Sequence, residues 1–102
     1  MIYLDAAKKA LRWIENRLQE DGSIQGFPED IACYFKAPTL FLIQGREDLA
    51  HKVLNHIQSR FMQPNGDFMS SEGVKSTNPA YVQFWIYTNS WIVTGAHRVG
   101  LS

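Results

Sequence analysis

Two stretches of the chain, residues 3–19 and 46–63, place an apolar residue at every third or fourth position, with polar residues between them. This spacing predicts two amphipathic helices, each with one face directed at a core. The apolar stripes consist of Tyr3, Ala7, Leu11, Ile14 and Leu18 in the first stretch and of Leu49, Val53, Ile57 and Phe61 in the second.

Two other stretches, residues 30–44 and 79–99, are apolar on nearly every side, which is typical of helices buried between neighbours. Asn78 and Pro79 form a suitable cap and first turn for the later stretch. Pro38 predicts either a kink in the earlier stretch or a late helix start. Periodicity alone would also allow strands here, but the length of the segments and their helical neighbours favour helices.

The chain repeats itself with a period of about 43 residues. Residues 7–17 align without gaps on residues 50–60, and Gly22 then matches Gly66 after one inserted residue. Repeats of this length are typical of stacked helical hairpins, which cannot bury their apolar faces singly. We therefore predict one all-α domain, residues 1–102, built from two antiparallel hairpins at about 3–45 and 46–100. The one-sided helices should lie outside and the apolar helices inside.

Composition excludes several classes of protein. Ten basic residues balance ten acidic ones, so the chain lacks the basic surface that nucleic-acid binding requires. The longest apolar run, around residues 40–43, is far shorter than the roughly 20 residues of a membrane span. The start lacks the pattern of a secretion signal, and the single Cys33 fits a reducing compartment. We expect a cytoplasmic protein that binds neither nucleic acid nor membrane.

Two loop segments resemble a known family. Residues 17–24, Arg-Leu-Gln-Glu-Asp-Gly-Ser-Ile, and residues 62–68, Met-Gln-Pro-Asn-Gly-Asp-Phe, are similar to the glutamine–Asp-Gly–aromatic repeats of the terpenoid-cyclase and prenyltransferase α/α-toroid superfamily. Residues 34–38 and 87–91 resemble inner-helix signatures of the same family. The resemblance implies that the two hairpins are about a third of an α/α toroid. It implies no chemistry, because the aspartate-rich, paired-aspartate and zinc-binding motifs of the family are absent.

Lys36 stands in the middle of an apolar segment, where a lysine needs either a partner or a route to solvent. Glu29 is seven residues earlier, on the same face if the helix begins that early, and Asp30 follows it. Carboxylates gathered at one end of the helices could act as general acid and base. We therefore predict Lys36, Asp30 and Glu29 as candidate catalytic residues, although solvated loop carboxylates would have the same pattern.

Aromatic residues of the apolar segments supply a second set of candidates. Tyr34, Tyr87 and Trp91 are predicted to bind a ligand, because aromatic faces stabilise cations and stack on sugars. Core packing explains these residues equally well. The possible metal ligands do not converge, since His51 and His56 are about 140° apart around a helix. We assign no metal and no cofactor to the set of Cys33, His51, His56 and His97.

Three functions stay open at this point. The chain could be an enzyme or enzyme fragment of the terpenoid-cyclase type, acting on an apolar or prenyl-like ligand in an aromatic-lined cavity. It could instead be a carbohydrate-processing α/α barrel, or a non-catalytic helical repeat for binding or assembly. Two hairpins leave apolar edges uncovered. We therefore also expect either a homo-oligomer or a chain that is part of a longer polypeptide.

Overall fold

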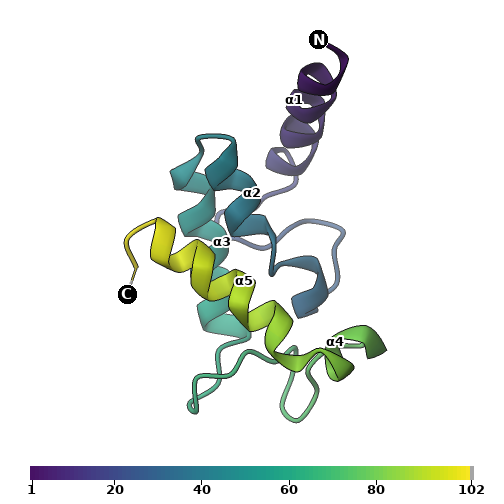
Figure 1. Ribbon diagram of the computed structural model, residues 1–102, viewed down its shortest axis with the longest axis vertical. Helices are drawn as coiled ribbons and strands as arrows, with labels where there is room; N and C mark the ends of the chain where they lie inside the picture. The colour runs from purple at the N-terminus through teal and green to yellow at the C-terminus, as the bar shows by residue number, and fades with distance from the viewer. Residues whose placement is uncertain (102) are drawn as a thin grey trace.

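In the computed structural model, which describes residues 1–101, every regular element is helical. The elements are α1 (Ile2–Glu15), a short 3-10 turn η1 (Ile31–Cys33), α2 (Ala37–Ile43), α3 (Glu47–Arg60), α4 (Pro79–Gln83) and α5 (Trp85–Arg98) (Figure 1). Isolated bridges replace strands within this range. The predicted all-α class is confirmed.

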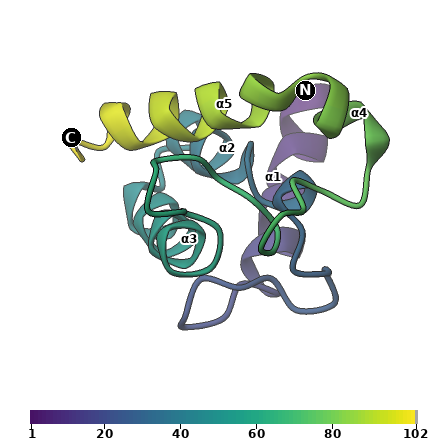
Figure 2. The ribbon, with the colours of Figure 1, turned by 90° about the horizontal axis from the view of Figure 1, so that it is seen from below.

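The body of the molecule consists of α2, α3 and α5, and α1 projects away from it (Figure 1). α2 packs against both α3 and α5, and Figure 2 shows α5 forming one layer above the other two. None of the helices within residues 1–101 combines the length and the apolar character that crossing a membrane requires. The buried core draws on these three helices and on the segments before α2 and after α3. Its members include Ile24, Ile31, Tyr34, Phe35, Phe41, Ile57, Phe61, Phe68 and Ile92.

Both apolar segments form helices, but each is divided into a short turn and a longer helix. The first begins with η1, and α2 starts only at Ala37. Pro38 is the second residue of α2, where its missing N–H leaves no hydrogen bond unmade, so the late start is the correct alternative. In the second segment Asn78 caps α4 by accepting a hydrogen bond from the Ala80 amide, as predicted. Phe84 then leaves the helical region and α5 begins.

The two amphipathic helices end earlier than predicted, at Glu15 and Arg60. The chain turns back after each of them, and an antiparallel bridge forms between Leu18 and Ile24 and again between Met62 and Phe68. The two turns have the same hydrogen bonds, from Gln19 N to Ser23 O at 2.8 Å and from Gln63 N to Asp67 O at 2.7 Å. Gly22 and Gly66 occupy the left-handed region in both, at φ 87° and 90°. The repeat seen in the sequence is therefore a repeat in the structure.

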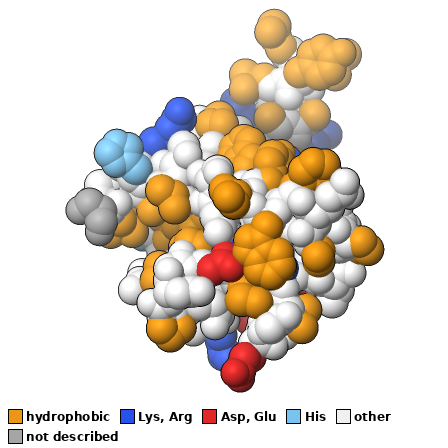
Figure 3. Space-filling view, turned by 60° about the horizontal axis from the view of Figure 1, so that its bottom comes forward, with side chains coloured by type: hydrophobic (Ala, Val, Ile, Leu, Met, Phe, Trp, Pro, Cys, Tyr) orange, Lys and Arg blue, Asp and Glu red, His pale blue; other side chains and the backbone are white. Residues whose placement is uncertain are grey.

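The outer helices differ in what covers them. α3 contributes six buried residues to the core, whereas α1 contributes none. Figure 3 shows hydrophobic side chains uncovered on the projecting helix. α3 packs mainly against α2, the inner helix of the preceding hairpin, and less against α5. The predicted hairpin of the first outer helix with α2 is not formed in this way, because the apolar stripe of α1 is only partly covered, at Leu11 and Ile14.

Candidate functional site

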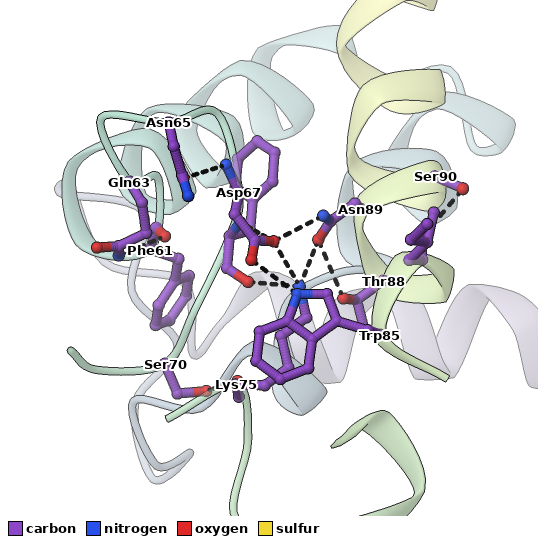
Figure 4. Close-up of polar contacts among 12 residues, drawn as sticks. Phe61, Gln63, Asn65, Asp67, Ser70, Lys75, Trp85, Thr88, Asn89 and Ser90 are labelled. Carbon is purple, nitrogen blue, oxygen red and sulfur yellow. Dashed lines mark hydrogen bonds and ion pairs between the residues drawn. The ribbon is translucent and has the colours of Figure 1, made fainter. Parts of the chain in front are cut away.

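A buried lysine that the sequence analysis did not single out joins the second turn to α5 (Figure 4). The side chain of Lys75 is fully buried. Its ammonium donates to Asp67 Oδ1 at 3.0 Å, to the Phe68 carbonyl at 2.6 Å and to Asn89 Oδ1 at 2.6 Å. Three acceptors match the three donors of an ammonium group, so Lys75 has no donor left for a ligand. Its position in a loop without periodicity gave no sequence signal.

Asp67 collects further donors around this lysine. It accepts hydrogen bonds from Trp85 Nε1 at 2.7 Å, from Asn89 Nδ2 at 2.8 Å and from the Phe68 amide at 2.8 Å. Burial raises the pKa of Asp67, but the bonds from Asn89, Trp85 and Lys75 outweigh it and lower the pKa to about 2. The carboxylate is therefore ionised at neutral pH, and it accepts four hydrogen bonds. The cluster of Lys75, Asp67 and Asn89 therefore has a structural role, which is to hold the second turn against α5.

Asp30 forms a second hydrogen-bonded cluster, which connects η1 to the loop that precedes α4. It is 4% exposed and accepts four hydrogen bonds, from the Ala32 amide and Ser76 Oγ at one oxygen and from the Thr77 amide and hydroxyl at the other. Burial raises its pKa, and the bonds from Thr77, Ala32 and Ser76 more than offset that effect, so the pKa falls to about 2. A carboxylate saturated with donors in this way is suited to holding the loop and poorly suited to proton transfer.

Glu29 and Tyr34 belong to a third set of contacts, around the first turn. Glu29 Oε1 lies 2.7 Å from Nε2 of the buried His56. The Tyr34 ring lies 4.9 Å from the His56 ring, and its hydroxyl accepts a hydrogen bond from the Ile24 amide at 3.0 Å. The seven-residue spacing between Glu29 and Lys36 does not place them on one helix face, because residues 29–36 do not form a continuous helix.

Lys36 lies on the surface among aromatic rings. Its ammonium is 5.5 Å from the ring centre of Phe35, 5.6 Å from that of Tyr87 and 5.4 Å from that of Trp91. These distances fall within the range of cation–π attraction. The Trp91 and Lys36 side chains lower the pKa of the Tyr87 phenol. Of the six predicted site residues, the structure brings Lys36, Tyr87 and Trp91 together, and Asp30, Glu29 and Tyr34 form other bonds.

A hollow of about 490 Å³ opens beside this aromatic cluster, between α2, η1 and Trp91 of α5. Lys36 is the one charged residue that lines it, and the ammonium takes part in none of the ion pairs formed by residues 1–101. The other lining residues are Ile14, Ala32, Cys33, Phe35, Ala37, Thr39, Leu40, Ile43, Tyr81 and Trp91. The hollow is thus an apolar surface with a single cation at its edge.

Thr39 adds an unpartnered polar group to this surface. The residue is 7% exposed, and its hydroxyl is the one buried side-chain polar atom without a hydrogen-bond partner in the described part of the chain. Thr39 also lines a neighbouring hollow of about 390 Å³ between α2 and α5. A buried hydroxyl without a partner costs about 1–3 kcal/mol. The oxygen itself lies beside Gly95 of α5, in the contact between the two helices.

The remaining candidates offer no reactive group. No three His, Cys, Asp or Glu side chains of residues 1–101 come together as metal ligands would. Burial, followed by the charge of Asp30, raises the pKa of the half-buried Cys33 thiol. A thiol held in its protonated form is a poor nucleophile.

Comparison with protein-family models, with curated proteins and with solved structures gave no match to this chain. The function of the chain is therefore inferred from the geometry of the Lys36 hollow.

Proposed function

We propose that this chain is a non-catalytic helical-repeat module that binds an apolar molecule with an anionic end group, such as a prenyl diphosphate. The observation that carries the proposal is the Lys36 ammonium, which forms no ion pair with any of residues 1–101. It is surrounded by three aromatic rings at the edge of an apolar hollow. The volume of about 490 Å³ falls within the range of small-molecule sites.

The residues that line the hollow offer different surroundings for the two ends of such a ligand. The hydrocarbon part would lie along Ile14, Leu40 and Ile43, where it removes apolar surface from water. The anionic end would meet Lys36, and a charge-assisted hydrogen bond there contributes about 1.5–3 kcal/mol.

The positions of the two predicted acids favour binding over acid–base catalysis. Asp30 and Glu29 are bonded to Thr77 and His56, and neither forms an ion pair with Lys36. The same positions disfavour carbohydrate processing, since a glycosidase site needs two carboxyl groups facing one cleft. Tyr87 and Trp91 could still stack on a sugar, so sugars serve as the competing ligand class in the test.

The architecture that would carry this function is a short arc of an α/α toroid of the terpenoid-cyclase type. Its support is the equal geometry of the two turns, each of which follows an amphipathic helix and precedes a capped helical turn. In that arrangement α2 and α5 form part of the inner wall. Lys36, Tyr87 and Trp91 would then face the interior of the ring.

Ligand titration of the wild type and of Lys36→Met tests the binding proposal. Methionine keeps the unbranched stem and removes the charge. We expect a prenyl diphosphate to bind the wild type and to lose about tenfold or more in affinity with Lys36→Met, whereas the matching prenyl alcohol binds both equally. Lys8→Met, an exposed lysine of α1, is the matched control and should bind like the wild type.

Two results would refute the proposal. One is that neither the diphosphate nor the alcohol shifts the melting temperature or the tryptophan fluorescence of the wild type. The other is that Lys36→Met and Lys8→Met bind the diphosphate equally well. Binding of a small sugar in place of both prenyl compounds would favour the carbohydrate alternative.

A further inference from the structure

α1, in the first repeat, has an apolar face equivalent to the packing face of α3, but none of the residues of α1 is buried. The six buried residues of α3 are Leu49, Ala50, Val53, Leu54, His56 and Ile57. Their counterparts in the repeat are Ala6, Ala7, Ala10, Leu11, Trp13 and Ile14. All six counterparts are apolar, and none of them is buried. α1 thus has an apolar face like the one with which α3 packs into the rest of the chain.

The site into which α3 packs, its seat, is formed by α2 and by the first repeat. Gly22 lies so close to α3 that a Cβ atom on it would be 2.0 Å from the Lys52 carbonyl oxygen. Arg46, just before α3, forms a 2.8 Å ion pair with Glu15 at the end of α1. Leu11, Ile14 and Leu18 pack against the core that α3 completes, and Ile24 is 2% exposed.

The corresponding seat on the second repeat is open. A groove of about 520 Å³ lies between α3 and α5, and Gly66, the counterpart of Gly22, has no neighbouring atom within 4 Å of an added Cβ. The second repeat contributes Leu54, Ile57, Gln58, Met62 and Phe68 to this groove, which are the counterparts of Leu11, Ile14, Glu15, Leu18 and Ile24. The α5 side adds Ile92, Val93, Ala96, His97 and Leu101.

We propose that α1 of a second copy of this chain occupies the groove between α3 and α5, in the position that α3 occupies between the first repeat and α2. The chain then associates head to tail. Gly66 of one copy would lie against the Lys9 carbonyl and Trp13 of the other, as Gly22 lies against Lys52 and His56 within the chain.

The polar residues at the edge of the groove are compatible with this occupant. In the internal contact Glu15 pairs with Arg46. At the proposed contact the counterparts are Gln58 on the groove and Tyr3 on the incoming helix. Neither Gln58 nor Tyr3 is charged, so the proposed contact leaves no unpaired ion at the position of the Glu15–Arg46 pair.

A head-to-tail contact is heterologous, so it propagates into a ring or an open chain unless a variant stops it. The mass of the 102-residue chain, measured by light scattering over about a hundredfold range of concentration, should exceed that of one copy and rise with concentration. A wild type that stays monomeric over this range would overturn the proposal. So would an assembly that the variants below leave intact.

Two exposed positions block the two sides of the contact separately. Ala10→Glu puts a carboxylate on the α1 face, where its counterpart Val53 is fully buried, and Val93→Glu puts one into the groove. Each variant should weaken self-association at least about tenfold, because an unpaired carboxylate would be buried in an apolar contact. Arg12→Gln and Thr94→Glu are the matched controls and should associate like the wild type. The counterpart of Arg12, Asn55, is exposed on α3, and Thr94 lines a different hollow.

Mixing the two blocked variants gives the sharpest test. Ala10→Glu retains an intact groove and Val93→Glu retains an intact α1, so an equal mixture should form a dimer and nothing larger. An interface of α1 with α1 would not be restored by mixing, and Val93→Glu would not affect it. Either result would overturn the head-to-tail arrangement. These readouts are independent of Lys36, so the ligand proposal can fail while this one stands.

Discussion

Replacing Lys75 with methionine should destabilise the chain more than any exposed substitution. Lys75→Met removes three hydrogen bonds of 2.6 to 3.0 Å. It leaves the Phe68 carbonyl without this donor and Asn89 Oδ1 with only the longer bond of 3.4 Å from the Thr88 hydroxyl. Breaking a buried pair by removing one partner costs about 3–5 kcal/mol. Asp67 retains bonds from Trp85 and Asn89 and is partly exposed, so we expect about 2–4 kcal/mol. A domain of this size has roughly 5–15 kcal/mol in total.

Urea unfolding followed by circular dichroism measures this loss directly. The matched control is Lys52→Met, which removes a 3.5 Å pair between a lysine that is 38% exposed and a fully solvated Glu20. An exposed pair of this kind contributes at most about 1 kcal/mol. If the two variants unfold at the same urea concentration with equal slopes, the Lys75 cluster does not stabilise the fold as its geometry indicates. Asp67→Asn combined with Lys75→Met should cost less than the sum of the single changes, because the two residues interact.

Two further predictions concern the stability of the chain at low pH and the effect of replacing a glycine. The pKa values of Asp30 and Asp67 lie at about 2 in the folded chain, below the ordinary 3.8, so the unfolded chain binds protons more readily and stability should fall as the pH drops from about 4 to about 2. Urea midpoints across that interval check this, and Asp30→Asn should flatten the fall. Gly22→Ala should lower the melting temperature far more than Gly73→Ala, because both have positive φ but only Gly22 has a backbone oxygen in the place of the new Cβ. Equal melting temperatures would contradict the packing of the first turn against α3.

Local patterns predicted the helical class and several local features. The two glycine turns, the Asn78 cap and the late start of α2 at Pro38 depend on residues close together in the sequence, and the structure confirms them. The helix ends were wrong because Leu18 and Met62 continue the apolar spacing while belonging to turns. An apolar stripe shows that a helix can pack against a core, but it does not show how much of the stripe this chain covers. α1 is covered only in part, at Leu11 and Ile14.

The candidate site was predictable only in part, for a related reason. Tyr87 and Trp91 are four residues apart on one helix, a spacing that places them on the same face, and the structure adds Lys36 from the segment before α2. The expected link from Lys36 to Glu29 assumed a continuous helix that does not exist. Lys75 was missed because its partners, Asp67 and Asn89, are 8 and 14 residues away in loops and helices whose contact no local pattern encodes.

Residues 75–77 link the two halves of the molecule. Lys75 is bonded to Asp67 and Asn89 in the second half, whereas the next two residues, Ser76 and Thr77, donate to Asp30 in the first. Repeat arrays whose units touch only through apolar faces can lose one unit at a time. Here three consecutive residues bond to both halves at once, so the packed helices α2, α3 and α5 should unfold together in a single cooperative step.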